Sequence, residues 1–275
     1  MPRRDQLMTA ALRRVSVDEF RQAPDHDDRY FADGFADADR YLDRFDGSLD
    51  FAGKSILDVG CGYGSLCLRA VERGARRAVG IDMEPKFTAF AQDKLASEYA
   101  HMADRVEFHL VDPSGWDSDE RFDIVLSKDS FEHIADPESY VEDMKRHLEP
   151  GGLLAIGFGP LWRSPYGAHQ RWMTALPWAH LLFPERVVMA EWRRLGFPDG
   201  AERYEEISGG LNKMTLSRFL SITDDPELQP LFRQVNQTTS RAGKVLETVR
   251  RLPGVGELCA FNVYAVWRYA PRISA

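Results

Sequence analysis

Between residues 54 and 156 the chain alternates short apolar runs with longer stretches of helical spacing, and a turn separates each pair. The apolar runs span 55–59, 78–81, 106–111, 122–126 and 153–158. This order is typical of a parallel sheet covered by helices on both faces. It predicts a doubly wound α/β fold, in which ligands bind beyond the carboxyl ends of the strands.

Segments outside this repeat predict a single domain, 1–275, with additions to the sheet. Aromatic residues at loosely helical spacing indicate an N-terminal helical segment over 1–50. Residues 159–210 hold four of the six tryptophans and form an aromatic-rich cap in this interpretation. The EPGG sequence at 149–152 predicts a turn into the last apolar run, 153–158. In the closing part, 211–275, Thr215 is expected to cap a helix and 258–269 to form a strand.

Composition excludes some classes of protein. A 44% share of hydrophobic residues and 28% of charged residues are ordinary for a soluble globular chain. No uncharged stretch reaches membrane-spanning length, and the N-terminus does not resemble a signal peptide, so a cytoplasmic protein without membrane partners is expected. Cys61, Cys67 and Cys259 lack paired spacing and predict buried free thiols. A net charge of -8 disfavours nucleic acid as the main partner.

The segment 56–64, ILDVGCGYG, carries the strongest candidate chemistry. Gly60, Gly62 and Gly64 let the backbone approach a ligand closely between a strand and a helix. Asp82 ends the next apolar run about 20 residues later, where a carboxylate holds ribose hydroxyls. A dinucleotide fingerprint would place its third glycine at Ser65, so a pyrophosphate-containing cofactor is the weaker interpretation, although a nicotinamide-dependent oxidoreductase stays open.

Five segments in order resemble the class I S-adenosylmethionine-dependent methyltransferases, in their small-molecule, type 11-like branch. They are DVGCGYG, GIDMEP, LVDPSGW, FDIVLSKDSFEHIADP and LEPGGLLAIG. The resemblance implies a Rossmann-like sheet of seven strands with the last one antiparallel, and a cofactor-binding core over 51–158. It also implies S-adenosyl-L-methionine as cofactor and S-adenosyl-L-homocysteine as product, with no metal expected.

The resemblance also assigns residues to the cofactor. Asp82 would accept the ribose hydroxyls, Met83 would pack on adenine, and Asp112 would accept from the adenine amino group. Asp58 would organise the glycine loop or meet the amino group of the methionine moiety. The full set implied to bind the cofactor is Asp58, Gly60, Gly62, Gly64, Asp82, Met83, Asp112, Ser127 and Lys128.

Methyl transfer to a hydroxyl benefits from a base of near-neutral pKa, for which histidine is the usual choice. His133 follows the fourth apolar run and His169 follows the fifth, so both are candidate catalytic residues. His180 is expected to be a satisfied core or pocket-wall residue. The residues expected to shape an acceptor pocket under the cap are Trp162, Tyr166, Trp172 and Trp178.

The function expected from these observations is methyl transfer to a hydroxyl group of a small molecule. SPYGAHQ, PWAHLLFPE and LNKMT resemble methyltransferases linked to glycan or secondary-metabolite assembly. The run after the fourth strand lacks the Asn/Asp-Pro-Pro-aromatic set that grips a flipped base, which again disfavours nucleic acid. A non-catalytic cofactor-binding subunit and an N- or C-methyltransferase are the alternatives, and a homo-oligomer is left open.

Overall fold

The computed structural model describes residues 3–17, 26–112, 115–197, 200–207 and 209–272. Its centre is a sheet of seven strands in the order β3-β2-β1-β4-β5-β7-β6. Strand β7 is antiparallel to both of its neighbours, and the pairs from β3 to β5 are parallel. The strands are β1 (Ser55–Val59), β2 (Arg77–Asp82), β3 (Val106–Leu110), β4 (Phe122–Lys128), β5 (Leu148–Phe158), β6 (Leu228–Val235) and β7 (Val263–Tyr269). The predicted doubly wound α/β fold is therefore confirmed.

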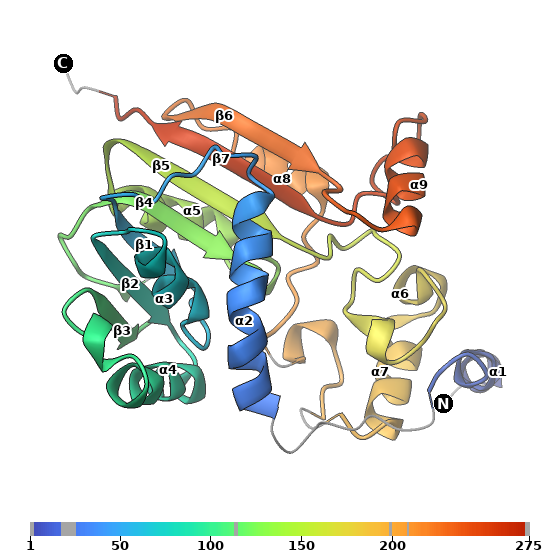
Figure 1. Cartoon of the computed structure of the whole chain (residues 1–275). Coiled ribbons are helices and arrows are strands. Elements are labelled where there is room, and N and C mark those ends of the chain that lie inside the picture. Colours follow the sequence, from blue (N-terminus) through green and yellow to red (C-terminus); the bar gives the residue numbers. More distant parts are fainter. Residues whose placement is uncertain (1–2, 18–25, 113–114, 198–199, 208, 273–275) are drawn as a thin grey trace.

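Helices cover both faces of the sheet (Figure 1). One face packs against α2, α3 and α4, and the other packs against α5 and α8. The α-helices are α1 (Arg3–Arg13), α2 (His26–Asp43), α3 (Ser65–Glu72), α4 (Pro85–Ser97), α5 (Pro137–Arg146), α6 (Ala179–Leu182), α7 (Glu185–Arg194), α8 (Leu216–Ile222) and α9 (Arg241–Arg250). The expected cap at Thr215 is present, because its side chain accepts from the Arg218 backbone N–H at 3.2 Å.

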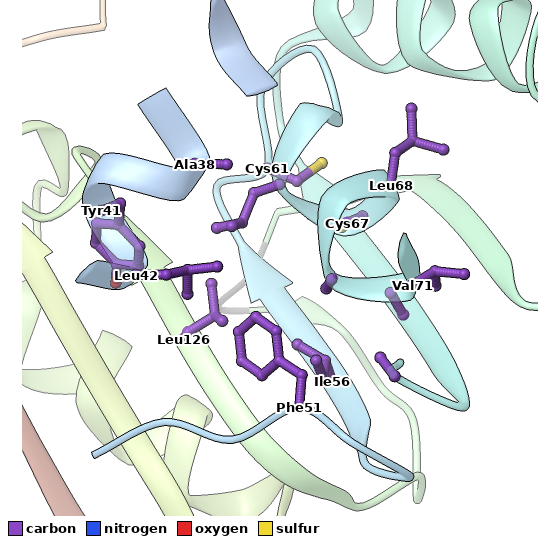
Figure 2. Close-up of a cluster of buried hydrophobic side chains, with 14 of the residues drawn as sticks. Ala38, Tyr41, Leu42, Phe51, Ile56, Cys61, Cys67, Leu68, Val71 and Leu126 are labelled. Atoms are coloured by element: carbon purple, nitrogen blue, oxygen red, sulfur yellow. The ribbon is translucent and has the colours of Figure 1, made fainter. Parts of the chain in front are cut away.

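Burial on both faces explains why the central strands lack polar alternation. All five residues of β1 are buried, with Ile56 facing the α2–α3 side and Leu57 the α5–α8 side. Figure 2 shows Ile56 among side chains from α2, α3 and β4, including Leu42 and Leu126. Burying each large aliphatic side chain contributes roughly 1.5–3 kcal/mol, so this layer fixes the sheet and, with it, the loops at its edge.

The aromatic residues of the N-terminal segment anchor α2 against the sheet. The Tyr41 hydroxyl donates to the Ser127 carbonyl oxygen at 3.0 Å, and its ring lies against β5 at Gly157. A Cβ at Gly157 would lie 2.4 Å from the ring of Tyr264, so only glycine allows this approach. Helix α2 is thereby held across the carboxyl ends of β4 and β5, where ligands of this fold bind.

Two strand predictions differ from the structure, and the apolar pattern did not predict one strand. EPGG lies inside β5, because Phe122 pairs with Leu148 and Ile124 already pairs with Leu153, so the four residues between bulge out of the ladder. The last strand begins at Val263 rather than at residue 258, since 259–261 bond to the side chain of Asn236. Strand β6 was missed; it is a mostly exposed edge strand containing a proline, which weakens the strand pattern.

A third hydrophobic cluster lies apart from the sheet and joins the cap to the N-terminus. It contains Leu12 from α1, Val187 and Trp192 from α7, and buried residues of the 195–211 segment. Helix α1 thus packs on α7 while α2 packs on the sheet (Figure 1). In the described ranges, no helix combines the length and apolarity needed to cross a membrane. All three cysteines are buried free thiols, as predicted.

Candidate active site

The glycine loop follows β1 and is tied to the end of β2. The backbone N–H groups of Gly60 and Cys61 donate to the Ile81 carbonyl oxygen at 2.9 and 3.1 Å. Gly60, Gly62 and Gly64 all have positive φ, at 79°, 53° and 82°. This left-handed backbone is costly for other residues, and it turns the chain into α3.

Two of these glycines also avoid collisions. A Cβ at Gly60 would lie 2.5 Å from Ser130 Oγ, and one at Gly64 would lie 2.5 Å from the Phe108 ring. Nothing lies within 4 Å of a Cβ built on Gly62, so this residue borders open space. Packing therefore requires the outer glycines, while Gly62 leaves room for a ligand.

Asp82, the last residue of β2, clamps this loop. Its carboxylate accepts from the Gly62 N–H at 2.8 Å and from the Glu84 N–H at 2.9 Å. Each oxygen keeps a second lone pair for a ligand hydroxyl. Burial raises the pKa of Asp82, while these backbone donors favour its charged form.

Asp58 lies fully buried in β1, below the loop. Its Oδ1 has no hydrogen-bond partner among the described residues, and Oδ2 accepts only a weak bond from Cys67 Sγ at 3.7 Å. Burial raises the pKa of Asp58 to about 7, although the nearby Lys128 ammonium favours the carboxylate. A buried acceptor without a donor is costly, and such a group marks a ligand site.

The other residues expected at the cofactor are distributed along the same edge. Met83 is 64% exposed directly after β2, and Asp112 is exposed after β3. Two residues of the LVDPSGW segment, 113 and 114, lie outside the described residues. Ser127 and Lys128 end β4 instead of following it, and the Ser127 side chain is buried. Burial opposes the charge of Lys128, but the adjacent Asp129 carboxylate at 2.9 Å keeps its pKa raised.

A cavity of about 570 Å³ lies at the carboxyl end of β5, beneath the cap. Tyr166, His169 and Trp172 line it from the cap, Arg44 lines it from the turn after α2, and Tyr264 lines it from β7. The remaining lining residues are Asp129, Gly159, Pro160, Ser164, Pro165, Arg171, Gln237, Thr238, Ser240, Ala242, Gly243, Leu246, Phe261 and Asn262. The cavity is therefore built from more of the chain than the 159–210 cap alone.

Of the four aromatic residues expected around an acceptor, two line the cavity and two do not. Tyr166 and Trp172 line the cavity, and Trp172 is 72% exposed. Trp162 does not line it; its ring packs edge-on against His180 and Tyr204. Trp178 is also outside the lining, and its indole N–H is shared between the carbonyl oxygens of Arg163 and Leu258.

Histidines 133 and 169 meet beside this cavity, although 36 positions separate them in the chain. Their ring centroids are 5.2 Å apart. His133 lies in the short helix η3 (Phe131–His133), and His169 precedes η4 (Gln170–Trp172) with a left-handed φ of 56°. Burial lowers the pKa of His133, and burial together with His133 lowers that of His169 to about 4.

His180, by contrast, is a satisfied core residue, as expected. Its Nδ1 accepts from the Gln170 amide at 2.6 Å, and its Nε2 donates to the Trp162 carbonyl oxygen at 2.6 Å. Both ring nitrogens are engaged within the protein, so His180 has no nitrogen free for a substrate.

Two residues of this site were not predicted from the sequence. Glu132 is buried next to His133, and burial followed by the charge of Asp129 raises its pKa well above the ordinary value. Asn212 anchors η3 by donating from Nδ2 to the carbonyl oxygens of Phe131 and Ile134, both at 2.8 Å. The signals were the FEH sequence and the Gly-Gly pair before LNKMT, but their meeting depends on the fold.

A glycine loop between β1 and α3, a carboxylate ending β2 and an antiparallel seventh strand together define the architecture of class I methyltransferases. A family model described as a methyltransferase domain matches residues 56–152. Over these residues the chain is similar to the class I S-adenosylmethionine-dependent methyltransferases of the small-molecule branch.

Two curated relatives illustrate this similarity. Ubiquinone biosynthesis O-methyltransferase of Nitrobacter winogradskyi is 36% identical over 117 residues, which cover 42% of this chain and 43% of that protein. The 27-O-demethylrifamycin SV methyltransferase of Amycolatopsis mediterranei is 29% identical, covering 69% of this chain and 79% of that protein. The match to the first relative thus spans less than half of its length.

Solved structures share the fold at low sequence identity. Geranyl diphosphate C-methyltransferase from Streptomyces coelicolor superposes with a TM-score of 0.56 at 14% identity, over 91% of this chain and 86% of that one. The [4+2]-cyclase SpnF gives 0.55 at 18% identity, over 86% and 81%. At this identity the likeness concerns the fold.

The residues present fit S-adenosylmethionine. The unpartnered Oδ1 of Asp58 suits a buried ammonium donor, and the open space at Gly62 accommodates a ligand against the backbone. Asp82 offers carboxylate lone pairs to ribose hydroxyls, and the exposed Met83 side chain offers an apolar surface to a base. These groups lie along the ends of β1 and β2.

Proposed function

We propose that this protein transfers the methyl group of S-adenosylmethionine to a hydroxyl group of a small molecule bound in the 570 Å³ cavity. The observation that carries the proposal is the meeting of His133 and His169 beside this cavity, at the same sheet edge as the glycine loop. The two curated relatives are named as methyltransferases that act on oxygen, which supports a hydroxyl acceptor.

The bound cofactor supplies a methyl group already activated on a sulfonium. The protein therefore has to position the acceptor and exclude water, and good positioning is worth roughly 7–11 kcal/mol of the barrier. Gly60, Gly62 and Gly64 provide the backbone cradle, and Asp58 and Asp82 provide buried carboxylates. Lys128 balances this negative charge from the end of β4.

The proton of the acceptor hydroxyl passes to a histidine in this proposal. His133 donates from Nδ1 to the Gly210 carbonyl oxygen at 2.6 Å, so its Nε2 carries the free lone pair. His169 Nε2 is buried and has no hydrogen-bond partner within the described ranges. Burial lowers the pKa of both rings and favours the uncharged form that accepts a proton. A pKa of about 4 makes His169 a weak base, so His133 is the better candidate for the proton acceptor.

The lining of the cavity favours a flat, partly apolar acceptor with polar substituents. Tyr166, Trp172 and Tyr264 provide aromatic surface, and the volume lies in the range of pockets for drug-sized ligands. Ser164 Oγ and Asn262 Oδ1 are buried lining atoms that lack partners among the described residues. A hydroxylated aromatic or polyketide-like metabolite meets these requirements. Trp178 supports this wall, because its backbone N–H donates to the carbonyl oxygen of the lining residue Pro165 at 2.6 Å.

Calorimetry and transfer of a labelled methyl group test the proposal. The wild type is expected to bind S-adenosylmethionine and to methylate a member of a panel of phenols and hydroxylated metabolites. Asp82→Ala should lose at least tenfold in cofactor affinity, because the loop loses its clamp and the ribose its acceptor. Asp104→Asn, at a carboxylate 79% exposed, is the control and should bind normally.

Each contrary result has a defined meaning. Unchanged binding by Asp82→Ala would refute the cofactor site. Cofactor binding with no transfer to any acceptor and no slow hydrolysis would favour a non-catalytic binding subunit. Tight binding of reduced nicotinamide cofactor would favour an oxidoreductase. The cytoplasmic location, the lack of a nucleic-acid partner and the open oligomeric state stay predictions of the sequence.

A further inference from the structure

Three side chains that could ligate a metal converge beside the acceptor cavity. Glu132, His133 and His169 each offer one ligand atom, and these atoms lie within 4.8 Å of one another. Two of them come from η3 and the third from the loop before η4. Methyl transfer itself does not explain why a carboxylate is buried against two imidazoles.

Two of these residues have buried polar atoms without a partner among the described residues. They are Oε2 of Glu132, a residue only 3% exposed, and Nε2 of His169. A buried polar atom without a hydrogen bond costs roughly 1–3 kcal/mol, and both residues belong to a group whose ligand atoms lie within 4.8 Å of one another. An ion that both atoms ligate removes this cost.

The surroundings of His133 match those of a metal-ligating histidine. Its Nδ1 donates to the Gly210 carbonyl oxygen at 2.6 Å, which fixes the ring orientation and leaves Nε2 with its lone pair. A Cβ at Gly209, where φ is +83°, would lie 3.2 Å from the same Nδ1. The Asn212 side-chain amide donates to the carbonyl oxygens of Phe131 and Ile134. The Asn212 backbone N–H donates to the Glu132 carbonyl oxygen at 3.0 Å.

We propose that Glu132, His133 and His169 bind one divalent transition-metal ion, with zinc as the best-matched element. Two imidazole nitrogens and one carboxylate oxygen are a donor set of catalytic zinc sites, which keep an open coordination position. His169 lines the cavity, so the open position faces the acceptor.

The use of this ion in catalysis rests on the proposed function, whereas its binding does not. An acceptor hydroxyl that ligates the ion loses its proton to solvent more readily, because the metal lowers the pKa of bound oxygen ligands. A nitrogen bound to the ion has no lone pair for a proton. The histidines therefore act as ligands in the loaded protein and as proton acceptors in the metal-free protein.

Metal titration of the chelator-treated full chain tests the site. Calorimetry with Zn²⁺ is expected to give one tight site per chain, and Co²⁺ is expected to give the intense visible absorption of a four- or five-coordinate ion. Glu132→Gln and His169→Asn should each weaken Zn²⁺ binding at least tenfold. Asparagine tolerates the left-handed backbone at position 169, so that variant removes the ligand with little strain.

His101→Gln is the matched control, because it removes an exposed histidine outside the cluster and should leave affinity unchanged. A wild type that binds S-adenosylmethionine but no Zn²⁺ would overturn the metal site and leave the proposed function standing. A weak Co²⁺ spectrum typical of octahedral coordination in the wild-type protein would also overturn the metal site. Tight Zn²⁺ binding without methyl transfer, with or without the ion, would support the site and refute the proposed function.

Discussion

Asp58 is the residue whose charge should couple stability to cofactor binding most strongly. Its ordinary pKa of 3.8 rises to about 7 in the folded chain because of burial. The folded state thus holds the protonated form more firmly than the unfolded state does. The stability that this difference provides is complete below pH 4 and is lost as the pH rises to 7, by about 4 kcal/mol in all.

Asp58→Asn removes this dependence, since the amide does not ionise. The variant gains up to about 4 kcal/mol at pH 8 from the missing charge and loses roughly 1–3 kcal/mol because its amide N–H₂ lacks an acceptor. We expect a net gain of about 2 kcal/mol at pH 8 and no gain at pH 4. Cofactor affinity should fall at least tenfold, because the buried carboxylate for the ammonium group is gone.

Urea unfolding of the ligand-free protein at several pH values between 4 and 8, followed by circular dichroism, measures this effect. Asp104→Asn, a matched change at an exposed carboxylate, should keep the pH dependence of the wild type. Parallel stability curves for the wild type and Asp58→Asn would show that Asp58 is ionised in the folded chain and that the reasoning is wrong.

Three further predictions concern the loop, the η3 anchor and the cavity. Gly64→Ala should lower the free energy of unfolding by about 2–4 kcal/mol in urea titrations, because residue 64 has a φ of +82° and a Cβ there would collide with the Phe108 ring. Gly62→Ala should cost only about 1 kcal/mol, because nothing lies near its Cβ position. Equal losses in the two variants would contradict the packing argument. Asn212→Asp should cost about 2 kcal/mol and reduce kcat while the cofactor Kd stays constant, and an unchanged kcat would remove its positioning role. Trp172→Ala should raise KM for the acceptor and change stability by less than about 0.5 kcal/mol, and an unaffected KM would place the acceptor elsewhere.

The sequence by itself determined the sheet and the cofactor loop. Apolar runs such as 55–59 mark strands buried on both faces, and Gly60, Gly62 and Asp82 act through local geometry near their own strand ends. Such features depend on neighbours within a single strand–turn–helix unit and its adjoining strand, so residue types and spacing suffice to find them. Strand β6 was not predicted, because an exposed edge strand that contains a proline shows little alternation of apolar and polar residues.

Only the tertiary structure decided what surrounds the acceptor. His133 and His169 each had a sequence argument, but their meeting, and the part that Glu132 and Asn212 play there, depend on residues 209–212 folding back onto η3. The same packing placed Trp172 on the cavity and Trp162 against His180 and Tyr204 instead. Contacts between distant segments are set by the joint packing of the cap, α2 and α9, and no periodicity in one segment encodes that arrangement.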